Sequence, residues 1–147
     1  MSDFLSALRI SGSGLSAQRT RVNVAASNLA NAESTRGPDG QPYHRRDPVL
    51  SAVGFEAELN GASAQPGDPS SPQGVEVTQV VEDQTPGKKV YLPGHPDADT
   101  DGFVTFPNVN PLHETVNLLT ASRGYEANAA AVETLKSMAQ RALDIVR

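Results

Sequence analysis

The chain has no cysteine and no tryptophan among its 147 residues, and aromatic side chains make up only 5% of it. The absence of cysteine excludes disulfides, thiolate zinc sites and cysteine nucleophiles. Because aromatic side chains dominate the area that compact cores bury, their scarcity argues against one large core. The sequence also contains no apolar run near the ~20 residues that span a bilayer. The N-terminus lacks a basic region followed by a continuous apolar stretch, so we expect no cleavable secretory signal.

Proline is absent from residues 1–35, whereas ten of the eleven prolines lie between Pro38 and Pro107. A proline inside a helix removes a hydrogen bond and costs ~3 kcal/mol, so the middle of the chain cannot be helical for long. We therefore predict helices within residues 1–35 and 109–147. Between them we predict a Pro/Gly-rich segment, residues 36–108, with short strands at 43–51, 75–81, 88–92 and 102–106 and a flexible stretch at 61–73.

Both terminal segments carry the pattern of an amphipathic helix that packs on another helix. Four apolar residues near the N-terminus are spaced seven apart, and near the C-terminus small or apolar residues recur at spacings of three and four. The sequence thus predicts a mainly α fold with a small β-rich insertion, in which the long terminal helices pack as a coiled-coil-like pair. We expect these helices to form an assembly interface, with the following residues in it: Leu8, Leu15, Val22, Leu29, Leu118, Tyr125, Asn128, Val132, Leu135 and Val146.

Local signals refine the helix boundaries and leave two alternatives open. The first helix is expected over about residues 2–32, and the second begins at Pro111, with Asn108 or Asn110 as its cap. The glycines in residues 12–14 indicate either a kink or the close approach of a neighbouring helix. The polar Asn128 lies in the apolar seam, where it either fixes the helix register or turns to a polar edge, and we favour the first.

The net charge of −5 is concentrated in the middle of the chain. Residues 1–35 carry a net +1, residues 109–147 are neutral, and residues 36–108 carry −6. Near-neutral ends can pack side by side without repulsion, and the acidic middle favours solvent. The only basic cluster, residues 44–46, is expected in a solvated strand or loop. Nothing resembles a nucleic-acid footprint.

Residues 97–102 (DADTDG) match the first half of an EF-hand calcium loop. The twelfth position, which should hold a bidentate glutamate, is Asn108, so we expect a turn rather than a metal site. His95 has no nucleophile or second histidine in a recognisable catalytic spacing. We therefore expect no enzymatic activity, no cofactor and no small-molecule substrate.

Two motifs resemble signatures of a known family. Residues 22–35 (VNVAASNLANAEST) resemble the N-terminal signature of bacterial flagellar axial proteins of the rod and hook group, and residues 122–128 (SRGYEAN) resemble their C-terminal signature. Between them, GPDGQPYHRRDPV and VYLPGHPDADTDGFVTFPNVN are most similar to proximal rod proteins of the FlgC type. The family more often has alanine at the position of Gly124, and the stretch 61–73 has more proline than the family pattern.

The resemblance implies a structural subunit of the flagellar basal-body rod, a periplasmic helical tube that transmits torque from motor to hook. It implies export through the flagellar type III apparatus without a cleaved signal peptide. The partners would be copies of the chain, other rod proteins, neighbouring basal-body components and the export apparatus. Two other interpretations remain, a cytoplasmic coiled-coil adaptor and a small calcium-binding module around residues 97–101.

Overall fold

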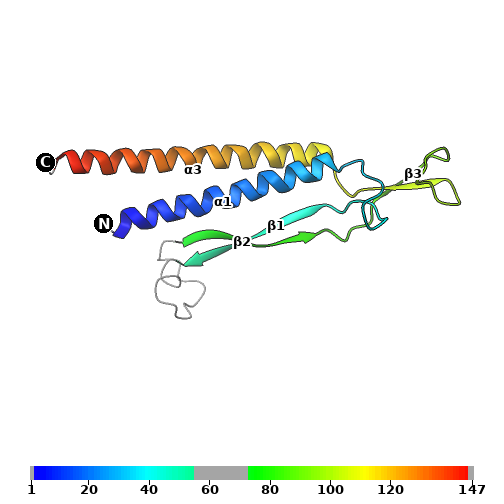
Figure 1. Ribbon diagram of the computed structural model, residues 1–147, viewed down its shortest axis with the longest axis horizontal. Coiled ribbons are helices and arrows are strands. Elements are labelled where there is room, and N and C mark those ends of the chain that lie inside the picture. The colour runs from blue at the N-terminus through cyan, green and yellow to red at the C-terminus, as the bar shows by residue number, and fades with distance from the viewer. Residues whose placement is uncertain (1, 55–72, 146–147) are drawn as a thin grey trace. The chain divides into compact units, whose positions relative to one another are not determined.

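The computed structural model describes residues 2–54 and 73–145 (Figure 1). Its elements are, in order, α1 (Ser2–Ala30), β1 (Arg46–Gly54), β2 (Gln73–Glu82), β3 (Lys88–Tyr91), β4 (Phe103–Phe106) and α3 (Pro111–Ile145). The predicted fold class, two long terminal helices with a small β insertion, is confirmed. Residues 61–72 of the predicted flexible stretch, and Val146, lie outside the described residues.

The helix α1 runs without interruption through residues 12–14 and ends at Ala30. At this end the carbonyl of Ser27 accepts two hydrogen bonds from Asn31, one from its backbone N–H at 3.1 Å and one from its side-chain amide at 2.8 Å. The chain then leaves through a turn in which the N–H of Ala32 donates to the carbonyl of Leu29.

The helix α3 begins at Pro111, as predicted. Of the two candidate caps, Asn110 is the one used, because its Oδ1 accepts the N–H of Leu112 at 3.0 Å and that of His113 at 3.4 Å. A side-chain oxygen here satisfies amides that have no partner inside the helix. Asn108 instead bridges two loops, accepting the N–H of Arg45 and donating to the carbonyl of Asp83.

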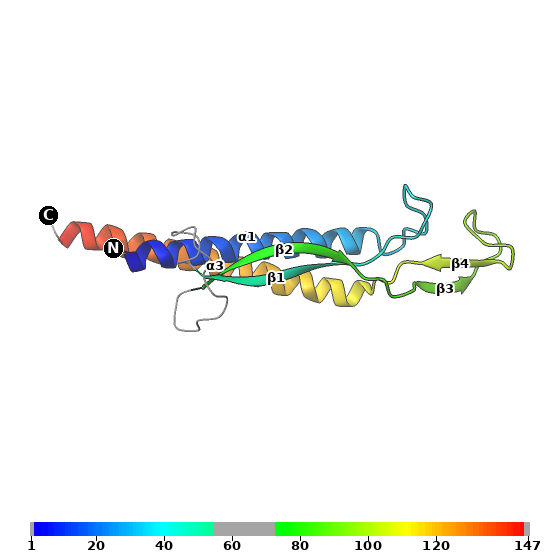
Figure 2. The same cartoon turned by 90° about the horizontal axis from the view of Figure 1, so that it is seen from below.

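The strands form two separate antiparallel ribbons and not one small sheet (Figure 2). In the first ribbon β1 pairs with β2, and in the second β3 pairs with β4. The register of the β3–β4 ribbon places Val90 opposite Val104 and Tyr91 opposite Phe103. Val104 is only 1% exposed, so one face of this short ribbon is covered.

The chain divides into two compact units, and each terminal helix contributes to both. The first unit combines Met1–Thr20, Val49–Gln79 and Thr120–Arg147, and the second combines Arg21–Pro48 and Val80–Leu119. Among the described residues, the buried apolar side chains are small: Ala17 and Ala121 in the first unit, and Ala25 and Val104 in the second. Neither unit therefore has a core of large side chains.

Candidate assembly interface and buried polar cluster

In the first unit, α1 and α3 approach each other through glycines. A Cβ atom added to Gly14 would lie 3.0 to 3.1 Å from the side-chain amide of Asn128, and one added to Gly124 would lie 2.9 Å from Cδ of Gln18. Such distances are shorter than ordinary van der Waals contact, so only glycine fits without a shift at either position. This contact supports the close-approach explanation for Gly14, while a Cβ at Gly12 would meet nothing within 4 Å.

Asn128 is half-buried at this contact. Its Nδ2 donates to the carbonyl of Gly124, four residues earlier in α3, at 3.0 Å. The amide is therefore satisfied within its own helix while its other surface lies against Gly14 of α1. Its role in fixing register stays a prediction.

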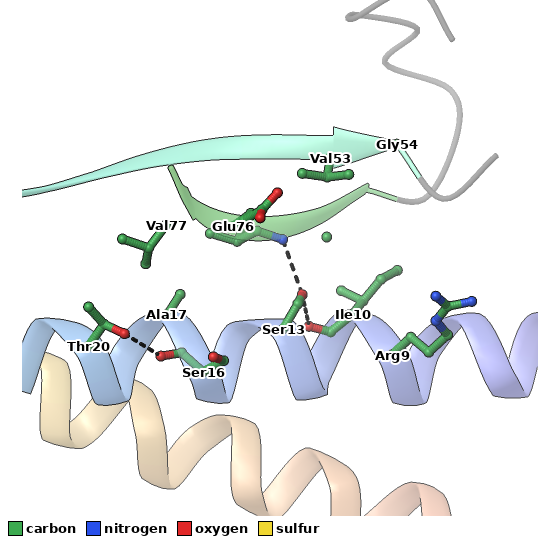
Figure 3. Close-up of a pocket in the computed structure, with 12 residues that line it drawn as sticks. Arg9, Ile10, Ser13, Ser16, Ala17, Thr20, Val53, Gly54, Glu76 and Val77 are labelled. Carbon is green, nitrogen blue, oxygen red and sulfur yellow. Dashed lines mark hydrogen bonds between the residues drawn. The ribbon is translucent and has the colours of Figure 1, made fainter. Parts of the chain in front are cut away.

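On its other side, α1 faces the β1–β2 ribbon of the same unit (Figure 3). The hydroxyl of Ser13 donates to the carbonyl of Ile10 at 2.8 Å and accepts the backbone N–H of Val75 at 3.1 Å. Beside this link lies a groove of about 570 Å³. Its apolar lining comes from α1 and both strands and includes Ile10, Ala17, Val53 and Val77. One serine thus ties the helix to an edge of the ribbon.

The second unit contains a buried polar cluster centred on Asn28 and Glu114, which are 0% and 1% exposed. Asn28 Nδ2 donates to Glu114 Oε2 at 3.0 Å and to the carbonyl of Arg46 at 2.8 Å. Its Oδ1 accepts the N–H of Arg46 at 2.9 Å and the hydroxyl of Tyr43 at 2.9 Å. One amide from α1 is therefore bonded to the first residue of β1, to the loop before it and to α3.

An ion pair completes the cluster. Arg45 Nε donates to Glu114 Oε1 at 2.8 Å, and the Arg45 side chain is only 18% exposed. Burial opposes ionisation of the Glu114 carboxyl, but hydrogen bonds from Asn28 and Arg45, together with the charge of Arg45, outweigh it and lower its pKa. Glu114 also lies in the first turn of α3, where the helix dipole favours a negative charge.

This arrangement corrects the expectation that residues 44–46 are a solvated basic cluster. Arg45 points inward to Glu114 because a buried carboxylate needs a charged partner. Arg46 is about half exposed, pairs with Glu82 at 2.9 Å and lies 5.7 Å from the centre of the Tyr43 ring. His44 is half-buried, with Nδ1 3.2 Å from the carbonyl oxygen of Asp83.

The predicted interface residues differ in exposure. Tyr125 is 42% exposed and Leu29 is 37% exposed. The remaining members within the described residues are half-buried: Leu8, Leu15, Val22, Leu118, Asn128, Val132 and Leu135. Contacts between α1 and α3 also involve glycines and polar side chains, namely Gly14, Gln18 and Asn28 on α1 and Glu114, Gly124 and Asn128 on α3.

The first turns of α3 carry exposed apolar residues, and helical spacing in the sequence predicts them as one stripe. Leu112 is 74% exposed and Leu119 is 53% exposed. With the exposed Val116 they recur at spacings of four and three, so they form one stripe along the first turns of α3.

The DADTDG segment is a turn, as predicted. Asp99 Oδ1 accepts the N–H groups of Asp101 and Phe103, while Asp97 accepts the hydroxyl of Thr35 at 2.8 Å. Within residues 2–54 and 73–145, no group of three His, Cys, Asp or Glu residues is arranged to hold a metal ion. The described helices also include none that is both long and apolar enough to cross a membrane.

Comparison with known proteins identifies the family. A model of the flagella basal body rod protein family matches residues 8–38, and a model of the C-terminal region of flagellar basal body rod FlgEFG proteins matches residues 100–145. The flagellar basal-body rod protein FlgC of Salmonella typhimurium strain LT2 is 45% identical over 136 residues, covering 92% of each chain. FlgC of Escherichia coli O6:H1 is 47% identical with the same coverage. FlgC of Bacillus subtilis strain 168 is 41% identical over 144 residues, covering 94% of this chain and 95% of that one.

The chain belongs to the FlgC family of flagellar basal-body rod proteins. The predicted family resemblance is therefore confirmed, and with it a structural role in the basal-body rod. The relatives are named as rod proteins, and none of the comparisons favours an adaptor or a calcium-binding module.

The polar cluster was missed at the sequence level, although a signal for it exists. Asn28 is a polar residue in the small, apolar part of the N-terminal signature, VNVAASNLANAEST. A polar residue with such neighbours is expected to be buried and bonded. Its partners Arg46 and Glu114 lie 18 and 86 residues further along the chain. No local pattern could have paired them, because only the fold brings α3 beside α1 at this point.

Proposed function

We propose that this FlgC-family rod subunit assembles through its terminal helices into a helical tube, with copies of itself and other rod proteins, and that the tube transmits torque from motor to hook. The observation that carries the proposal is the exposed apolar stripe of α3 around Leu112 and Leu119. Exposed apolar side chains aligned on one helix face are typical of surfaces that another protein covers.

The energetic argument follows from the small size of the buried residues. Three of the four buried apolar side chains in the described residues are alanines, so burial alone stabilises each unit little. Covering the apolar stripe by a neighbouring subunit gains ~25 cal/mol for each Å² of apolar surface removed from water. Helix packing and subunit assembly would thus stabilise one another, because a partner that binds only the folded form adds to its stability.

The finer assignments are part of this proposal. The predicted interface residues serve packing rather than catalysis, so the subunit has no enzymatic role. It reaches the periplasmic rod through the flagellar export apparatus without a cleaved signal peptide and contacts neighbouring basal-body components there. Many helix contacts in parallel would carry torque, with no single bond bearing the load.

A charge placed in the stripe tests the proposal. Leu119→Asp adds a carboxylate to the apolar stripe, and Thr120→Asp adds the same group to the next, also exposed, residue. In cells lacking the native protein, we expect Leu119→Asp to abolish hooks and swimming because its charge must be desolvated on assembly. The Thr120→Asp control should retain swimming in soft agar.

Circular dichroism of both purified variants checks that the helices are intact. If cells with Leu119→Asp build hooks and swim as well as the control, the stripe is not an assembly surface and the helix-based mechanism loses its support.

A further inference from the structure

The β3–β4 ribbon presents an exposed pair of aromatic rings. Tyr91 and Phe103 are direct partners across the ribbon, so both side chains lie on one face. Their ring centres are 5.3 Å apart in an edge-to-face arrangement. Tyr91 is 61% exposed and Phe103 is 41% exposed, whereas Val104 on the opposite face is 1% exposed. One face of the ribbon is therefore buried within the second unit, and the other face exposes the two aromatic rings.

The Tyr91 ring is held in place by a glycine. Gly102 has φ +80°, and a Cβ atom there would lie 2.9 Å from Cε2 of Tyr91 and 3.2 Å from Cβ of Pro93. The ring packs against the bare backbone of Gly102 in a conformation that favours glycine. A preordered aromatic side chain loses little conformational entropy on binding, which is typical of residues that dominate interface energies.

Two carboxylates border the aromatic pair in the turn before Phe103, and the exposed Lys89 lies on the same face of the ribbon, two residues before Tyr91. Asp101 immediately precedes Gly102, is exposed, and has no ion-pair partner in the part of the chain that the structure describes. Asp99 is also exposed, and its carboxylate accepts the N–H groups of Asp101 and Phe103. Aromatic faces and carboxylates both attract guanidinium groups, so the chemistry of this surface fits an arginine.

The chain itself provides such an arginine on α1. After Asp3, α1 contains three arginines and no carboxylate. Arg19 is exposed and takes part in none of the ion pairs found within residues 2–54 and 73–145. The exposed residues Gly12, Asn23 and Ala26 lie four or seven residues from Arg19, so they share its face of the helix. The side chains around Arg19 on this face are small, and the carboxylates beside the aromatic pair are its complement in charge.

We infer that the Tyr91–Phe103 face of one copy docks on the α1 face around Arg19 of a second copy. Arg19 would lie over the aromatic pair and against Asp101. The two faces differ, so the contact is head-to-tail and can propagate along a filament instead of closing a dimer. It involves surfaces separate from the α3 stripe, and its test requires no rod, so the two proposals can fail independently.

The absence of cysteine makes a cross-linking test direct. One full-length chain carries Thr100→Cys beside Asp101, and another carries Asn23→Cys one turn from Arg19; both positions are exposed. The control pairs Thr100→Cys with Ala130→Cys, an exposed position on α3 between Glu126 and Glu133. On mild oxidation of the mixed chains, we expect the disulfide between positions 100 and 23 to form roughly tenfold faster than the control, equivalent to ~1.4 kcal/mol.

Charge reversal identifies the contact. Asp101→Lys on the first chain, or Arg19→Glu on the second, should reduce the rate to that of the control, and the two reversals together should restore it. Equal rates for the α1 and α3 positions would overturn the inference, as would a rate that does not respond to these charges. A disulfide that forms only when both cysteines are on one chain would show intrachain docking and would also overturn it.

Discussion

The side chain of Asn28 forms hydrogen bonds with four groups. Its amide bonds the backbone N–H and carbonyl of Arg46, the hydroxyl of Tyr43 and the carboxylate of Glu114, all from a fully buried position. Buried polar groups are costly when one partner is removed, because the others lose their hydrogen bonds without regaining water. Asn28 is therefore the residue at which a small change should most affect the second unit.

Replacing Asn28 by leucine should strongly destabilise the chain. Leucine has a similar volume but removes the bonds that Asn28 makes to the Arg46 N–H and to Glu114 Oε2, so we expect the free energy of unfolding to fall by ~3 kcal/mol or more. Urea denaturation followed by tyrosine circular dichroism measures the loss. Asn23→Leu, at an exposed site on the same helix, is the control and should change the stability by less than ~0.5 kcal/mol. Similar losses in both variants would contradict the role of the cluster.

The ion pair of Glu114 predicts a pH dependence. Because the pKa of Glu114 is lowered in the folded state, its contribution to stability is complete above the ordinary glutamate value of 4.5 and is lost as pH falls through the folded-state pKa. Hydrogen bonds from Thr85 also lower the pKa of Asp83, so acid destabilises the chain through this site as well. We expect the Glu114→Gln variant to be less stable than the native chain at pH 7. Between about pH 5 and pH 3, where glutamate carboxyls ordinarily titrate, the variant should lose less stability than the native chain. Parallel pH profiles for the two chains would exclude Glu114 as a source of the acid sensitivity.

Single residues were predictable where their role is local. The cap at Asn110 and the start at Pro111 follow from the chemistry of a helix N-terminus, which needs only neighbouring residues. Arg45 was placed wrongly because its environment depends on Glu114, which is far away in sequence. From sequence alone a short basic run is expected to be solvated, because the buried carboxylate that pairs with it is identified only by the fold.

The contacts between α1 and α3 share one register. In the first unit, Gly14 lies against Asn128 and Gln18 lies against Gly124. A step of four residues towards the C-terminus of α1 therefore matches a step of four towards the N-terminus of α3. In the second unit Asn28 contacts Glu114, which is the pair that the same alignment requires. Each unit thus pairs the helices antiparallel with the same alignment. Glycines and polar residues mark this alignment.

Two glycines on α1 should respond differently to alanine. Alanine at Gly12 meets nothing within 4 Å and should stabilise the helix by ~1 kcal/mol through helix propensity alone. Alanine at Gly14 has the same favourable helix propensity, but its Cβ would contact the Asn128 amide, which is hydrogen-bonded to the carbonyl of Gly124. We expect Gly12→Ala to raise the thermal midpoint of far-UV circular dichroism and Gly14→Ala to raise it less or lower it. Equal increases would show that the helices do not approach closely at Gly14.

The sequence predicted the elements better than their pairing. Helical periodicity and the distribution of proline placed both helices and all four strands close to their observed bounds. The division of the strands into two ribbons was not predictable, because strand pairing depends on which loops close and on what each ribbon packs against. The heptad pattern also could not show which residues of α1 contact α3. Small residues such as glycine permit close contact but do not contribute to an apolar pattern.

At the scale of the whole molecule, scarce aromatics and small buried residues have a common consequence. The apolar residues that the described helices bury are alanines, while larger apolar side chains such as Leu112 and Met138 are exposed. A chain with this distribution is stabilised little by its own folding and more by contacts with neighbouring subunits. The net charge supports the same view, because the terminal segments are nearly neutral and the carboxylates are concentrated between them.

A buried charge in the helix pair should therefore stop assembly without stopping synthesis. Leu135 is half-buried on α3, and the register that pairs Gly14 with Asn128 places it opposite the first two turns of α1. A carboxylate there would lose water without gaining a partner, a strongly unfavourable exchange. We expect cells with Leu135→Asp to make and export the protein but to lack hooks and filaments, as seen by immunoblotting of exported protein and electron microscopy of basal bodies. Glu133→Lys, two residues away and exposed, should be tolerated far better. Normal swimming by Leu135→Asp cells would refute both the place of Leu135 in the interface and assembly through the terminal helices.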